Sequence, residues 1–150
     1  MNKGERPGEF KKHDYVTGIH EVGYAPEEVE PAISELVAEL AELSPNADVL
    51  KAAAYFHARF EYIHPFADGN GRVGRTLLNY FLMTHGEPSV IVYDEDKKEY
   101  YQALERYDAD EEIDALTEFL RKQTVKTWAK ALERSQGAMQ QPKKKLADFE

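Results

Sequence analysis

Apolar residues recur at helical spacing along most of this 150-residue chain. A first series follows Pro26 and Pro31, and proline suits the first turn of a helix. A second series covers about residues 47–62. A third begins near Gly71 and stops before Gly86, a residue typical of helix ends. The first half of the chain therefore predicts three consecutive helices.

The second half continues the helical pattern. One helix is expected after Asp94 or Asp96, and a last, long helix after Asp110, since aspartate favours the position before a helix. Residues 14–23 differ because they mix β-branched residues with glycines, which favours a short hairpin. The predicted fold class is all-α, a helical bundle with one short β-hairpin flap.

Composition divides the chain into one domain and two ends. Residues 1–9 and 136–150 are polar or lysine-rich without periodicity and are expected to be flexible, which leaves a domain at 10–135. No apolar run is long enough to cross a bilayer, and no leader precedes the first helix, so we expect a cytoplasmic protein without membrane contact. The absence of cysteine leaves secretion, as an effector for example, an open alternative.

The net charge of −9 argues against nucleic acid as a partner, because binding a long polyanion needs a basic surface. One short stretch is basic instead: Arg59, His64, Arg72 and Arg75 fall close together around two glycines. A basic spot in an acidic protein indicates a small anion as ligand.

The loop at 64–75 contains the parts of a phosphate site. Gly69-Asn70-Gly71 can turn tightly and point successive backbone N–H groups into one concavity. The loop leads into a helix N-terminus, which favours negative charge. Arg72 and Arg75, three residues apart, project from one side of that helix and can act as two cationic clamps.

Two further side chains of the loop suggest a reaction. Asp68 lies at the mouth of the cradle, where a carboxylate can hold Mg²⁺ together with phosphate oxygens. His64, expected to be extended because Pro65 follows it, is suited to accept a proton near neutral pH. We expect Arg72 and Arg75 to keep it neutral. Pro65 and Phe66 are interpreted as structural anchors of the loop.

The segment His64-Pro-Phe-Ala-Asp-Gly-Asn-Gly-Arg-Val-Gly-Arg75 resembles the signature of the Fic family, HPFx(D/E)GNGRxxR, at every fixed position. The similarity extends to Gly8–Gly23, which looks like the family's flap, and to the loop and helix that follow the motif. On this resemblance the chain is identified as a member of the family, and the expected function is a protein adenylyltransferase that uses ATP and Mg²⁺.

The resemblance also implies residue roles. His64 is the general base that deprotonates a serine, threonine or tyrosine hydroxyl of a target protein for attack on the α-phosphorus of ATP. Asp68 binds the Mg²⁺ that bridges the phosphates. The anion hole and phosphate clamps are implied to be Gly69, Asn70 (near the α-phosphate), Gly71, Arg72 (β- and γ-phosphates) and Arg75 (γ-phosphate). The product is an AMP-modified hydroxyl, with pyrophosphate released.

Partners are implied by the same resemblance. The target segment is expected to add a strand to the flap, with contacts from Tyr15, Val16, Thr17, Gly18 and Ile19. Many relatives carry an inhibitory helix with the pattern (S/T)xxxE(G/N), and no complete copy is found here, because Thr17 and Glu21 have the spacing but Val22 follows. Either a partner or a missing segment supplies the inhibitor, or this form is constitutively active.

Three alternatives remain open at this stage. A Fic-fold transferase could use another nucleotide or phospho-donor, or remove AMP. The chain could instead be a toxin-type interaction module controlled by a partner antitoxin. A metal hydrolase is the weakest alternative, because His57 and His64 lie seven residues apart across a helix end, without an HExxH arrangement.

Overall fold

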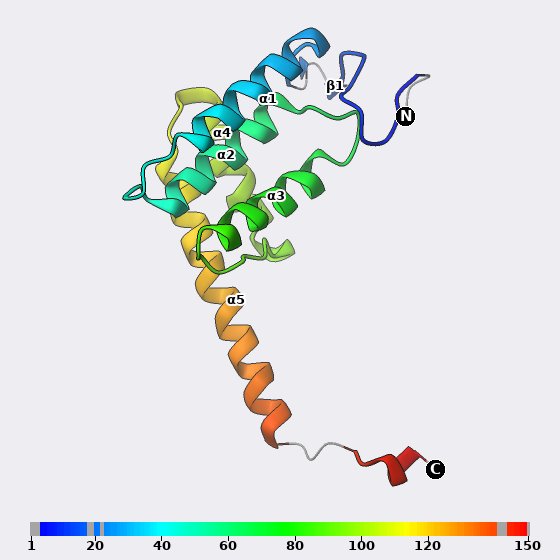
Figure 1. The fold of residues 1–150 in the computed structure, drawn as a ribbon, viewed down its shortest axis with the longest axis vertical. Helices are drawn as coiled ribbons and strands as arrows, with labels where there is room; N and C mark the ends of the chain where they lie inside the picture. The colour runs from blue at the N-terminus through cyan, green and yellow to red at the C-terminus, as the bar shows by residue number, and fades with distance from the viewer. Residues whose placement is uncertain (1–3, 18–19, 22, 141–143, 150) are drawn as a thin grey trace.

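The computed structural model describes residues 4–17, 20–21, 23–140 and 144–149. Its helices are α1 Pro26–Ala41, α2 Val49–Ile63, α3 Asn70–Thr84, α4 Lys97–Asp110 and α5 Asp114–Gln140, with short 3₁₀ turns η1 Asp94–Asp96 and η2 Leu146–Phe149. Figure 1 shows α1, α2 and α3 side by side, with α4 and the start of α5 packed behind them. The expected all-α class is confirmed.

The flap region is described only in part. Strands β1 Val16–Thr17 and β2 His20–Glu21 pair antiparallel, with Val16 opposite Glu21. Gly18 and Ile19, which would form the turn, lie outside the described residues, as does Val22. The pairing involves two residues per strand, so a complete hairpin flap stays a prediction.

The helix starts differ slightly from the sequence expectations. Of the two candidate prolines, Pro26 occupies the first turn of α1 and Pro31 lies inside the helix. Helix α2 is capped by Asp48, whose carboxylate accepts a hydrogen bond of 3.1 Å from the Lys51 backbone. The apolar face of α1 packs on the same side of α2 that carries Phe56. Helix α2 contacts α1, α3, α4 and α5, so it is the central helix of the bundle.

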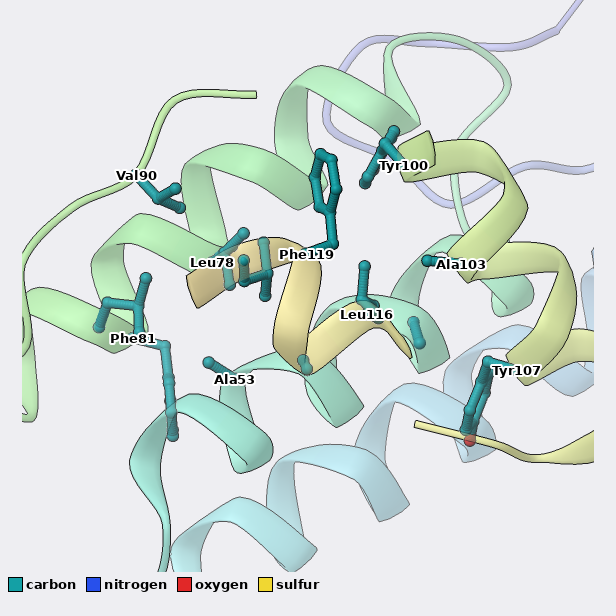
Figure 2. Packing of buried hydrophobic residues seen from close by; sticks show 13 residues of the cluster. Ala53, Leu78, Phe81, Val90, Tyr100, Ala103, Tyr107, Leu116 and Phe119 are labelled. Atoms are coloured by element: carbon teal, nitrogen blue, oxygen red, sulfur yellow. The ribbon is translucent and has the colours of Figure 1, made fainter. Parts of the chain in front are cut away.

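The main core lies between α2, α3, α4 and the first turns of α5 (Figure 2). Leu116 and Phe119 of α5 point into it, toward Leu78 of α3 and Tyr100 of α4. The Tyr100 and Phe119 rings have centroids 5.7 Å apart. Helices α2 and α3 are therefore held from behind by α4 and α5, and the loop that joins them is fixed at both ends.

The segment before α4 is held in place by side-chain amides of α3 and α5. The backbone of Val90 exchanges hydrogen bonds of 2.8 and 2.9 Å with the side-chain amide of Asn79. The Tyr93 N–H donates to the side-chain oxygen of Gln123 at 3.1 Å. These amides satisfy backbone groups that a sheet partner would otherwise satisfy.

Helix α5 is 27 residues long and continues beyond the bundle (Figure 1). Trp128 and Leu132, on its projecting part, are exposed. Its last turn covers 136–140, within the stretch assigned above to the tail. None of the helices in the described ranges is both long and apolar enough to cross a membrane.

Candidate active site

His64 closes α2 in an unusual backbone conformation. Its φ of 53° and ψ of 62° are left-handed, and its N–H donates to the Phe60 carbonyl at 3.0 Å. The expectation of an extended His64 is therefore wrong. Pro65 does exclude the right-handed helical conformation at this position, but the helix-terminating hydrogen bond selects the left-handed alternative. This turn ends α2 and leads the chain into the motif loop.

Two backbone hydrogen bonds from the N-terminal segment brace the loop on either side of His64. The Lys11 N–H donates to the Pro65 carbonyl at 2.9 Å, and the Tyr24 N–H donates to the Ile63 carbonyl at 3.0 Å. Gly23 passes so close that a Cβ there would collide with the Cβ of His64. No local pattern in the sequence signals these contacts with His64 and its neighbours, because the residues lie far apart in the chain.

The environment of His64 favours its neutral form. Burial lowers the pKa of the half-buried imidazole, and the nearby Lys11 charge lowers that pKa further. A hydrogen bond to the backbone of Glu61 acts in the opposite direction without reversing the shift. A neutral His64 was expected, but Lys11 and burial cause it, not the motif arginines. The imidazole can therefore accept a proton at neutral pH.

Asn70 locks the shape of the loop. Its side-chain oxygen accepts from the Phe66 N–H at 2.8 Å, and its side-chain nitrogen donates to the Phe66 carbonyl at 2.7 Å. The Phe66 ring in turn packs against Phe10 and Phe60. The Asn70 side chain is thus occupied within the protein, which leaves its backbone N–H group for a ligand.

The cradle itself is the start of α3. Gly69 caps the helix with a φ of 80°, a conformation that favours glycine. The backbone N–H groups of Asn70, Gly71 and Arg72 come next, and the first N–H groups of a helix have no partner within it. They point out of the helix end together with its positive dipole, which is the arrangement that binds anions.

Each motif arginine folds back over a glycine of the cradle. A Cβ on Gly69 would lie 3.2 Å from Arg72 Nη2, and one on Gly71 would lie 3.1 Å from Arg75 Nη1. The two guanidinium groups therefore border the free N–H groups. Arg75 also opposes the rise that burial causes in the pKa of Tyr100, a buried residue of α4. No local pattern in the sequence connects Tyr100 to the motif.

Asp68 is the carboxylate nearest to the cradle. Its Oδ1 accepts from the Gly69 N–H at 2.8 Å, and its Oδ2 lies 3.7 Å from Arg72 Nη2. Both side chains are largely exposed, at 76% and 78%. In the described part of the chain no three acidic or histidine side chains gather into a metal-binding group. A single carboxylate still fits Mg²⁺, because that ion is commonly held by one or two carboxylates together with substrate phosphates.

A cavity of about 540 Å³ opens beside the loop. It lies between residues 6–9 and the start of α3, and Asp68, Gly69 and Arg72 line it. A second hollow of about 610 Å³, between α4 and α5, contains none of the motif residues. Of these two hollows, only the one at the loop is lined by motif residues, and His64 and Arg75 are not among them.

The residues proposed to dock a target are placed incompletely. The Tyr15 hydroxyl donates to the Glu5 carboxylate at 3.0 Å, so this tyrosine is tied to the N-terminal segment. Val16 and Thr17 form β1, and Gly18 and Ile19 lie outside the described residues. Their contact with a target stays a prediction.

Solved structures of other proteins superpose on this fold. A Fic domain containing signalling protein from Bacteroides thetaiotaomicron superposes with a TM-score of 0.71 at 25% identity, over 91% of this chain and 58% of that one. Fic-1 from C. elegans superposes with a TM-score of 0.66 at 28% identity, over 80% of this chain and 36% of that one. The fold is thus that of Fic-domain proteins.

Sequence comparisons point to the same class of protein, the Fic-domain proteins. The profile of the Fic/DOC family matches residues 1–82. A protein adenylyltransferase Fic of Nematostella vectensis is 41% identical over 53% of this chain, and a probable protein adenylyltransferase of Aquifex aeolicus is 37% identical over 65%. The chain spans 19% and 30% of those two relatives. It belongs to the Fic/DOC family, whose named relatives are transferases.

Proposed function

We propose that the chain is a protein adenylyltransferase that transfers AMP from ATP to a hydroxyl of a partner protein. One observation carries this proposal: His64, kept neutral by burial and by Lys11, ends α2 just before the loop that leads into a helix N-terminus bordered by Arg72 and Arg75. A base beside an anion cradle is the combination that nucleotidyl transfer requires. The names of the relatives support the same reaction.

In the proposed step, the acceptor hydroxyl gives its proton to His64 while its oxygen forms a bond to the α-phosphorus. The bond between that phosphorus and the oxygen leading to the β-phosphate breaks, and pyrophosphate leaves with the electron pair. The N–H groups of Asn70, Gly71 and Arg72 stabilise charge on the phosphoryl oxygens.

The charged side chains divide the polyphosphate between them. Arg72 and Arg75 would hold the β- and γ-phosphates. Asp68 would hold Mg²⁺, which supplies charge neutralisation at the phosphates when bound. The acceptor segment would align along residues 14–23, close to His64, since Gly23 contacts that histidine.

Transfer of AMP from labelled ATP, followed by intact-mass spectrometry, tests the proposal. We compare the parent chain with His64→Ala and with a matched control, His13→Ala, whose side chain is exposed. His64→Ala should lose transfer by about 10²–10⁴-fold, the usual contribution of a positioned base, while retaining ATP binding. His13→Ala should transfer AMP at the parent rate.

Two outcomes would overturn this function. Equal transfer by His64→Ala and the parent would remove the assigned base. Transfer from GTP, UTP or CTP in preference to ATP would leave nucleotidyl transfer as the reaction but show that ATP is not the donor.

A further inference from the structure

Arg59 belongs to the basic group that the sequence gathers around the motif, yet it does not line the cavity at the loop. It lies on α2, between one and two turns before His64, and its side chain is half-buried. None of the ion pairs within the described ranges includes Arg59. The proposed reaction therefore does not use this cation, and no described carboxylate pairs with it.

The Arg59 side chain contacts Tyr24 in two ways. Arg59 Nη1 donates to the Tyr24 hydroxyl at 3.2 Å, and the central carbon of the guanidinium lies 5.7 Å from the centre of the same ring. The first contact is a hydrogen bond, and the second is within the range of a cation–π interaction. Because the two residues are 35 positions apart, these contacts tie the segment that follows the flap region to α2.

Tyr24 contacts the last turn of α2 at two further positions. Its ring packs edge-to-face on the ring of Tyr62, with centroids 5.7 Å apart. Its N–H donates to the Ile63 carbonyl at 3.0 Å. Arg59, Tyr62 and Ile63 are three and four residues apart, so they share one face of the helix. Tyr24 therefore holds this face of α2 at the point where the chain passes to His64.

Gly23, directly before Tyr24, lies against His64. A Cβ on Gly23 would collide with the Cβ of His64 and with the carbonyl oxygen of Ile63. The φ of 79° at Gly23 also favours glycine. Because Gly23 and Tyr24 are adjacent in the chain, fixing the Tyr24 side chain also fixes the backbone that touches His64.

The backbone of His64 requires this kind of support. Its φ of 53° lies in the left-handed region, where a residue other than glycine is strained. Such a conformation persists only where the surrounding structure holds it. The Tyr24 N–H holds the carbonyl just before His64, and the Lys11 N–H holds the Pro65 carbonyl just after it. The left-handed turn is therefore fixed by contacts outside the helix as well as by its own hydrogen bond.

We propose that Arg59 is a positioning residue for His64, which it holds through Tyr24 and Gly23. The role rests on the proposed function, because His64 is there the general base. The contacts run from the Arg59 guanidinium to the Tyr24 side chain, and from the backbone of residues 23 and 24 to the turn at His64. Arg59 acts through Tyr24 and is not itself a catalytic residue.

Rates of transfer and ATP affinities separate positioning from a purely structural contact. We measure transfer of AMP from saturating labelled ATP to the chain itself, and equilibrium binding of ATP. Arg59→Gln should lower the transfer rate about tenfold, less than the roughly 10²-fold that a misplacement of about 1 Å can cost. Its ATP affinity should equal that of the parent, since Arg59 does not border the cradle. A contact that only stabilises the fold would leave the transfer rate of the folded protein unchanged.

The matched control is Arg106→Gln, which replaces an exposed arginine of α4. It should transfer AMP at the parent rate. Tyr24→Phe removes only the hydroxyl that accepts from Arg59, and it should also slow transfer. If Arg59 acts through Tyr24, adding Tyr24→Phe to Arg59→Gln causes no further loss of rate. Losses that add, a parent-like rate in Arg59→Gln, or an equal fall in its ATP affinity would overturn the positioning role alone.

An NMR titration of the His64 ring gives a readout that does not depend on transfer. Burial is the largest influence that lowers the pKa of His64, and the Lys11 charge lowers it further. Tyr24→Phe changes no charge at neutral pH, so loss of cover over His64 should appear in this variant as a rise of that pKa toward 6.5. Arg106→Gln should leave the pKa of His64 as it is in the parent.

The two readouts distinguish failure of this role from failure of the proposed function. An equal pKa of His64 in the parent and in Tyr24→Phe contradicts the positioning role. A parent chain that binds ATP but transfers no AMP contradicts the proposed function, and the titration then still decides whether Tyr24 holds His64.

Discussion

The two motif arginines at the start of α3 lie in opposite environments. We call the side of α3 that carries Arg72 the outer edge, and the side that carries Arg75 the inner edge. On the outer edge, Asp68 and Arg72 are 3.7 Å apart and mostly exposed, so water screens their interaction. On the inner edge, Arg75 is half-buried and opposes the rise that burial causes in the pKa of Tyr100 and of Glu61. The outer pair can rearrange around a ligand at little cost, whereas the inner arginine borders the core.

Substitutions in the core beside the inner edge should therefore lower the free energy of unfolding strongly. Tyr100→Ala is expected to lower the free energy of unfolding by about 3–5 kcal/mol, because it removes a buried aromatic ring and the partner of His57. Tyr100→Phe keeps the ring and should cost about 1–3 kcal/mol, for the unpaired nitrogen. Urea unfolding measures both. Tyr101→Ala is the matched control, since the neighbouring Tyr101 is 52% exposed and Tyr100 is 1% exposed.

Similar losses in Tyr100→Ala and Tyr101→Ala would remove the distinction between the two edges. Equal stability of Tyr100→Phe and the parent would show that the His57 nitrogen finds another partner.

A smaller change in the free energy of unfolding is expected when pH alters the charge of Glu61. The pKa of Glu61 is raised from 4.5 to about 7 in the fold, so its stabilising contribution is present below pH 4.5 and is lost as pH rises through about 7. Glu61→Gln cannot ionise, so its stability relative to the parent should rise between pH 5 and pH 8, by the order of 1 kcal/mol. Urea unfolding at these two pH values checks the sign.

His57 behaves in the opposite way and does not confuse this measurement. Its pKa is lowered from 6.5 to about 4, so its contribution is present above pH 6.5 and is lost as pH falls through about 4. His57 is the same in both proteins and cancels in the difference. A constant difference between Glu61→Gln and the parent would show that Glu61 has no raised pKa.

The smallest effect on stability is expected at the outer edge. Arg72→Ala should change the free energy of unfolding by no more than about 0.5 kcal/mol, because it breaks only an exposed ion pair. The same variant should still weaken ATP binding, since it removes a cation beside the cradle. Urea unfolding and ATP titration on one preparation test both statements. A large loss of stability would mean that the outer edge is as fixed as the inner one.

Much of this protein could be predicted from local sequence alone. The 3.6-residue repeat of apolar positions predicted the helices, because each helix must bury one face. Glycines and arginines within one short loop predicted an anion cradle at the start of α3, since positive φ at Gly69 and the free N–H groups are local properties of the backbone. Family resemblance in the motif then assigned His64 a role that its neutral form supports.

Only the tertiary structure could decide which distant residues complete the site. Lys11 and Tyr24 brace His64 through hydrogen bonds to Pro65 and Ile63, and no local pattern announces such contacts. Arg75 affects the pKa of Glu61 and of Tyr100 because α2 packs on both α3 and α4. Burial and through-space charge depend on segments far apart in sequence, so they set the environment of Arg75 and the protonation of Glu61 only once the chain is folded.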